Sequence, residues 1–131
     1  MEARDGGVVL VVDDDAEVRR LIAEALEPFR ADVRLAATGE EALELMAGCR
    51  VLLLLLDLDL PGIDGLAVLE KLEREGADIP VVVLADEAGS GAVEAKAHGA
   101  CDVLRKPFRS RDVRSLARRH LIGRDPGERS S

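Results

Sequence analysis

The chain has 131 residues, of which 47% are hydrophobic and 34% are charged, as expected for one folded domain with its own core. A net charge of −8 and an aromatic content of only 2% argue against general nucleic-acid binding and against a base-stacking surface. No apolar run approaches the roughly 20 residues that cross a bilayer, so we expect no membrane span.

The cysteines and the first residues of the chain indicate the cellular compartment of the protein. Cys49 and Cys101 lie far apart, with no metal-ligand residues beside them. We therefore expect two buried free thiols in a reducing compartment, rather than a disulfide or a zinc site. The opening residues, MEARDGG, are not those of a signal peptide. Together these features predict a cytoplasmic protein.

A buried strand, a helix, an edge strand and a second helix are predicted first. Residues 7–12 form an unbroken apolar run that ends at Asp13, Asp14 and Asp15. Apolar residues then recur at helical spacing, and Asp15 is placed to cap that helix. The next strand and helix are predicted from alternating polarity and from a capping sequence, at residues 32–37 and 38–48.

The most informative stretch is VLLLLLDLDLPGIDG at residues 51–65. Its six apolar residues are too few to span a bilayer and lack the alternation of a half-solvated strand. They predict the central strand of a parallel sheet that helices cover on both faces. Asp57 would then lie at the carboxyl end of this strand, where open α/β sheets form their sites. Asp64 is placed to cap the following helix.

The second half of the chain continues this alternation of helices and strands. We predict a helix, a buried strand, a weak alanine-rich helix, a short strand and a final helix, at residues 66–74, 81–84, 89–98, 101–104 and 113–120. Five strands alternating with five helices predict an α/β fold with a doubly wound parallel sheet.

Charged residues follow three of the predicted strands. Asp13 and Asp14 follow the first strand, Asp57 ends the central strand, and Lys106 follows the last. Because the carboxyl ends of parallel strands lie at one edge of the sheet, we expect these residues and Asp59 to form one pocket. Clustered carboxylates raise one another's pKa unless a cation intervenes, and their oxygens suit Mg²⁺. Lys106 is placed to pair with Asp57 or to hold a phosphoryl oxygen.

The sequence resembles the receiver domains of response regulators in bacterial two-component signalling. The resemblance extends from about residue 8 to about residue 121. It rests on VVDDD at residues 11–15, LLDLDLPGIDG at 55–65, GACDVL at 99–104 and KPF at 106–108. It implies a flavodoxin-like receiver domain over residues 1–122, followed by a polar tail or linker over residues 123–131.

The resemblance implies a role for each carboxylate of the pocket. Asp57 is the expected phosphoacceptor, attacking the phosphorus of a phosphohistidine or of a small phosphodonor. Asp13, Asp14 and Asp57, with the backbone carbonyl of Asp59, are the expected ligands of Mg²⁺. The expected function is to receive a phosphoryl group from a histidine kinase or phosphotransfer protein and to relay it through altered protein contacts, without acting as a turnover enzyme.

Other positions match the family in part. Lys106 is expected to contact the phosphoryl group, and the peptide bond before Pro107 is expected to be cis. The family places Thr or Ser at the end of the fourth strand, where Ala85 offers only a backbone N–H. It places Tyr or Phe three residues before the lysine, where this chain has Val103, which has no rotamer swing of comparable reach. Asp86 adds a negative charge where phosphodonors would approach.

These departures leave a second function open. In this alternative the chain is a phosphorylation-independent pseudo-receiver that acts as a protein-interaction adaptor. A metal-dependent phosphatase, suggested by the aspartates at residues 57 and 59, is disfavoured because the chain has no cap domain or evident substrate pocket.

The family's usual output surface comprises the fourth helix, the last strand and the last helix. In this chain it would include five basic residues: Lys96, Arg109, Arg111, Arg114 and Arg118. Such a surface suits a homodimer, an acidic downstream target or a partner domain.

Overall fold

The structure is a computed structural model that describes residues 7–122, so the predicted tail at residues 123–131 lies outside the described residues. Ten regular elements alternate along the chain: β1 (Gly7–Val12), α1 (Ala16–Leu26), β2 (Asp32–Ala36), α2 (Gly39–Gly48), β3 (Arg50–Asp57), α3 (Gly65–Arg74), β4 (Val81–Ala85), α4 (Ala92–Ala97), β5 (Asp102–Arg105) and α5 (Ser110–Ala117). A 3-10 turn, η1 (Glu27–Phe29), follows α1, and a π-helical turn, η2 (Arg118–Ile122), follows α5. The predicted alternation of five strands and five helices is confirmed.

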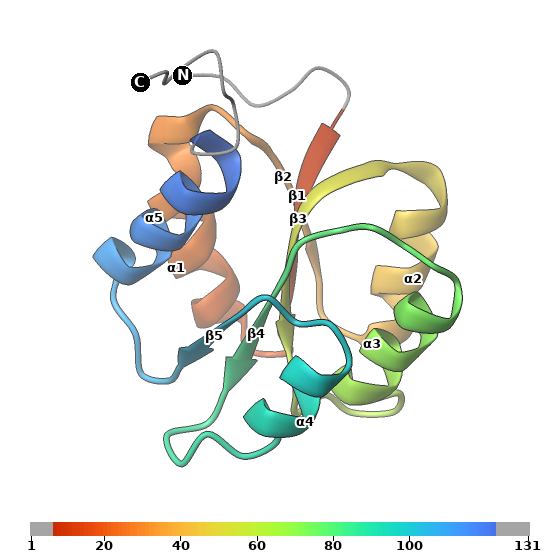
Figure 1. Cartoon of the computed structure of the whole chain (residues 1–131). Helices are drawn as coiled ribbons and strands as arrows, with labels where there is room; N and C mark the ends of the chain where they lie inside the picture. Colours follow the sequence, from red (N-terminus) through yellow and green to blue (C-terminus); the bar gives the residue numbers. More distant parts are fainter. Residues whose placement is uncertain (1–6, 123–131) are drawn as a thin grey trace.

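The five strands form one parallel sheet in the order β2-β1-β3-β4-β5. The leucine-rich run therefore supplies the middle strand, as predicted, with β1 on one side and β4 on the other. Figure 1 shows α1 and α5 on one face of the sheet and α2, α3 and α4 on the opposite face. This is the doubly wound arrangement that right-handed crossovers produce.

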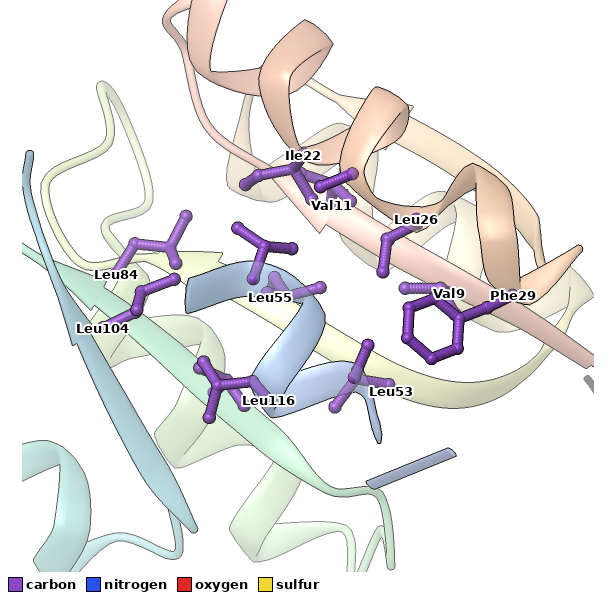
Figure 2. Close-up of a cluster of buried hydrophobic side chains, with 14 residues drawn as sticks. Val9, Val11, Ile22, Leu26, Phe29, Leu53, Leu55, Leu84, Leu104 and Leu116 are labelled. Carbon is purple, nitrogen blue, oxygen red and sulfur yellow. The ribbon is translucent and has the colours of Figure 1, made fainter. Parts of the chain in front are cut away.

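The two faces of the sheet bury alternate residues of the same strands. Leu53 and Leu55 belong to the cluster beneath α1 and α5, which Figure 2 shows. Leu54 and Leu56 belong to the cluster on the face of α2, α3 and α4. Each of these four side chains is at most 1% exposed, and full burial of a leucine contributes about 1.5–3 kcal/mol. A strand covered on both faces has no position for a solvated residue, which explains the unbroken apolar run.

Side-chain caps fix where the helices begin. The Asp15 carboxylate accepts a hydrogen bond from the Glu17 N–H at 2.9 Å, at the start of α1. The Asp64 carboxylate accepts one from the Ala67 N–H at 2.9 Å, at the start of α3. Both predicted caps are confirmed, and such caps contribute about 1 kcal/mol each.

Two of the sequence predictions are wrong. The helix predicted over residues 89–98 covers only Ala92–Ala97, because Gly89 and Gly91 adopt φ angles of 78° and 80°, outside the helical region. Both cysteines are free, as predicted, but neither is buried: Cys49 is half-buried and Cys101 is exposed. Cys101 directly precedes β5, an edge strand of the sheet. No helix within residues 7–122 has the length and apolar character to cross a membrane.

Candidate functional site

The carboxyl ends of β1, β3 and β5 bring together the charged residues that the sequence singled out. Asp13 directly follows β1, Asp57 is the last residue of β3, and Lys106 directly follows β5. One carboxylate oxygen from each of Asp13, Asp14 and Asp57 lies within 4.8 Å of the others. Lys106 joins the same group through ion pairs with two of these aspartates.

Asp13 is completely buried, and most of its polar atoms have partners. Its Oδ1 accepts a hydrogen bond from the Asp15 N–H at 2.9 Å. Its backbone carbonyl accepts one from Nη1 of Arg19 at 2.8 Å. Its Oδ2 lies 2.8 Å from Nζ of Lys106, with which it forms an ion pair. The positive charge of Lys106 therefore compensates for the burial of this oxygen.

Asp57 is 2% exposed and lies in an environment that disfavours its charge. Burial, and then the negative charge of Asp13, raise its pKa from 3.8 to about 6. The Asp59 N–H, which donates to Oδ1 of Asp57 at 3.2 Å, and Lys106, with Nζ at 3.5 Å from Oδ2, oppose this rise. An ionised Asp57 therefore gains from any additional cation in the site.

Lys106 is the nearby cation. Burial lowers the pKa of its ammonium group, but Asp13 and Asp57 outweigh this effect, and the pKa is raised above its usual value. Lys106 therefore carries its charge throughout the neutral range. Its peptide bond to Pro107 is cis.

The site residues also satisfy the requirements of a hard divalent cation. Asp14 is exposed, so the group of three carboxylates opens to solvent on one side. Asp13 contributes a buried carboxylate whose Oδ2 is paired with Lys106. Carboxylate oxygens with access for retained water are the ligands that Mg²⁺ prefers. The side chain of Asp59 is exposed, and its backbone N–H is directed to Asp57.

Close backbone packing fixes the loop that follows Asp57. The Gly65 N–H donates to the Leu58 carbonyl at 3.2 Å, so the start of α3 folds back against the end of β3. A Cβ atom at residue 65 would lie 2.2 Å from the Asp57 carbonyl oxygen. Only glycine therefore fits there, and the approach holds the Asp57 backbone in place.

The end of β4 lacks the polar side chain that the resemblance to receiver domains led us to expect. Ala85 is buried, and its carbonyl accepts a hydrogen bond from the Lys106 N–H at 2.9 Å. Val103 is half-buried and packs with the core cluster on the face of α2, α3 and α4. Neither residue brings a hydroxyl group or an aromatic ring to the site.

Asp86 has a structural partner that the sequence did not reveal. Its exposed carboxylate accepts a hydrogen bond from the Ser90 N–H at 2.9 Å, which lowers its pKa. The Asp86 carboxylate therefore helps to fix the conformation of the loop between β4 and α4. Arg19 was also missed by sequence reasoning, although its position one turn after the Asp15 cap was an available signal.

The five basic residues of the predicted output surface lie on α4, on α5 and directly beside α5. Lys96 is on α4, Arg109 precedes α5, Arg111 and Arg114 are on α5, and Arg118 follows it. Arg114 is half-buried and the other four are exposed.

Comparisons with known proteins identify relatives over most of the chain. The family model of the response regulator receiver domain matches residues 9–118. Response regulator MprA of Mycobacterium ulcerans (strain Agy99) is 40% identical over 122 residues, covering 89% of this chain and 53% of that protein. Response regulator MprA of Mycobacterium sp. (strain KMS) is 38% identical over 121 residues, covering 92% of this chain and 53% of that protein.

Solved structures show the same similarity. The receiver domain of NtrX from Brucella abortus has a TM-score of 0.80 and 33% identity, covering 86% of this chain and 97% of that chain. Chemotaxis response regulator CheY4 of Vibrio cholerae has a TM-score of 0.78 and 26% identity, covering 88% of this chain and 98% of that chain. The chain spans about half the length of the curated relatives that it matches.

Proposed function

The chain belongs to the response regulator receiver domains of two-component signalling, and we propose that it accepts a phosphoryl group on Asp57 from a histidine kinase or phosphotransfer protein in a reaction that depends on Mg²⁺. The observation that carries this proposal is the buried Asp57 carboxylate beside the buried Asp13 carboxylate and the Lys106 ammonium group. Such an arrangement keeps a nucleophile and a cation site in contact.

Asp57 would act as the nucleophile. One of its carboxylate oxygens forms a bond to phosphorus while the bond from phosphorus to the donor's imidazole nitrogen breaks, and the imidazole leaves. The product is a phosphoaspartate, a mixed anhydride, and the site has no need of a separate base because the carboxylate attacks in its ionised form. With a pKa of about 6, Asp57 is mainly ionised at neutral pH.

Asp13, Asp14 and Asp57, with the backbone carbonyl of Asp59, would hold Mg²⁺. When bound, this cation supplies positive charge to the phosphoryl oxygens. Lys106 lies 3.5 Å from Oδ2 of Asp57, within reach of a phosphoryl group attached there. We infer that Lys106 transfers its ion pair from Asp13 to the phosphoryl group, and that Ala85 adds only its backbone N–H.

The phosphorylated domain would act on other proteins. We propose that it alters contacts with a downstream target or partner domain, through the five basic residues on and beside α4 and α5 or through a homodimer on the face of α4, β5 and α5. This is a cytoplasmic signalling role without turnover of a substrate. The adaptor alternative gives no reason for a buried group of charges, whose desolvation costs stability, and we do not favour it.

Gel electrophoresis with a phosphate-binding additive tests the proposal. After incubation with a small-molecule phosphodonor and Mg²⁺, the wild-type protein should migrate more slowly, and Asp57→Asn should not. Asp64→Asn is the matched control, because asparagine caps helices as well as aspartate and Asp64 lies outside the site. A shift that persists in Asp57→Asn, or none in the wild type with any donor, would contradict the assignment.

A further inference from the structure

We propose that Arg105 is a positioning residue that holds the loop between β4 and α4 and connects this loop to Lys106. The inference deepens the proposed function: it assigns a route between the phosphorylation site and a neighbouring surface loop. Its second step, the response to phosphorylation, rests on that proposed function. Its first step, the holding of the loop, does not.

The loop, residues 86–91, is built by its own hydrogen bonds. The Gly89 N–H donates to the Asp86 carbonyl at 2.9 Å, and the Ser90 N–H donates to the Asp86 carboxylate at 2.9 Å. The Ala92 N–H donates to the Gly89 carbonyl at 3.1 Å. These bonds define one turn conformation, whose amide groups report on whether the turn is closed.

The side chain of Arg105 lies across this turn. Its Nη2 donates to the Ala88 carbonyl at 3.4 Å. A Cβ atom at residue 89 would lie 2.5 Å from Nη2 and 2.8 Å from Nε, so the guanidinium group packs directly against Gly89. In the sheet, Arg105 is paired with Ala85, the residue just before the loop. One residue therefore contacts both the start and the middle of this segment.

The loop also reaches the neighbours of both reacting side chains. Arg105 directly precedes Lys106 in the chain, so a displacement of Lys106 moves the base of the Arg105 side chain. At the other end of the loop, a Cβ atom at Gly91 would lie 3.2 Å from Cδ1 of Leu58, and Leu58 directly follows Asp57. The loop is thus in contact with residues adjacent to the proposed nucleophile and to the proposed phosphoryl ligand.

This chain lacks the family's switch residues, and the proposed route depends on other side chains. Ala85 and Val103 provide neither a hydroxyl group nor a ring, whereas Arg105 and Leu58 both touch the loop. Formation of a phosphoaspartate draws Lys106 toward the new charge. The Arg105 guanidinium group then moves relative to Gly89. The exposure of the amide groups of residues 86–91 to solvent changes as a result.

Amide hydrogen exchange in the protein without metal tests the first step. Arg105→Ala should accelerate exchange at Gly89 and Ser90 by about threefold to tenfold, the effect of losing one modest contact. Arg105→Lys should resemble Arg105→Ala, because an ammonium group keeps the charge but not the planar fork. Arg111→Ala, at an exposed arginine of α5, is the matched control and should leave these amides unchanged. Unchanged exchange in Arg105→Ala, or full protection in Arg105→Lys, would overturn the positioning role.

The second step is tested with Mg²⁺ and beryllofluoride, which mimics a phosphoryl group on aspartate. In the wild type the analogue should change exchange at Gly89 and Ser90 by at least about twofold. Arg105→Ala should bind the analogue and lose most of that response. Binding without any change at the wild-type loop would contradict the coupling alone. Absence of binding in the wild type would contradict the proposed function and leave the first test to decide whether Arg105 holds the loop.

Discussion

The side chain of Asp57 is 2% exposed, and burial together with Asp13 raises its pKa to about 6. An unfolded chain ionises this group near its usual pKa of 3.8. Because the folded pKa is the higher one, ionisation favours the unfolded state, and stability is lost as the pH rises from about 4 to about 6. Above that range the loss is constant.

Asp57→Asn should therefore stabilise the protein in the absence of metal. At pH 7 we expect its free energy of unfolding to exceed that of the wild type by about 1–3 kcal/mol, and at pH 4 the difference should nearly vanish. Urea denaturation in the presence of a chelator, at both pH values, measures this. A variant less stable than the wild type at pH 7 would show that the ionised Asp57 contributes more to folding than its burial removes.

Individual residues differ in how far the sequence could reveal them. Asp13, Asp57 and Lys106 could be grouped because each directly follows or ends a predicted strand, and strand ends meet at one edge. The contacts of Arg105 and Asp86 could not, because they depend on the path of the loop at residues 86–91, which the sequence pattern did not reveal. Arg19 could be placed on its helix, but not against the Asp13 carbonyl.

At the scale of elements, His98 connects α4 to α3. Its Nδ1 lies 2.7 Å from the Glu73 carboxylate, and its Nε2 lies 3.6 Å from that of Glu70. The hydrogen bond with Glu73 is the main cause of a raised pKa for His98. Because the folded pKa is above the unfolded value of about 6.5, the pair stabilises the fold fully below pH 6.5 and less as the pH rises through the folded pKa.

His98→Gln should consequently lower the melting temperature at pH 6 and have little effect at pH 9. The effect at pH 6 should weaken in high salt, because both partners reach solvent. Thermal denaturation followed by circular dichroism at the two pH values gives the comparison. Equal losses at pH 6 and pH 9 would mean that His98 acts through packing rather than through its charge.

The strands could be predicted more completely than α4. A doubly covered strand leaves a long apolar signal, and β3 and β4 both carry one. The caps at Asp15 and Asp64 could be recognised because side-chain capping is local. The start of α4 could not be placed, because the sequence does not reveal that Gly89 and Gly91 adopt φ angles of 78° and 80°, outside the helical region.

At the scale of the whole molecule, the sheet order places β1, β3 and β5 so that their ends form one charged edge. The central position of β3, flanked by β1 and β4, puts Asp57 in the middle of this edge. Helices on both faces exclude water from the strands (Figure 1), and the same burial raises the pKa of Asp57. The fold thereby produces the buried Asp57 carboxylate with a raised pKa that the proposed reaction uses.

Binding of beryllofluoride, followed by fluorine NMR, tests the central claim most directly, because it requires the aspartate, the cation site and the lysine together. Bound signals should appear with the wild type only when Mg²⁺ is present, persist in Asp64→Asn and be absent in Asp57→Asn. A wild-type protein that gives no bound signal at saturating Mg²⁺, or bound signals that survive in Asp57→Asn, would contradict the account.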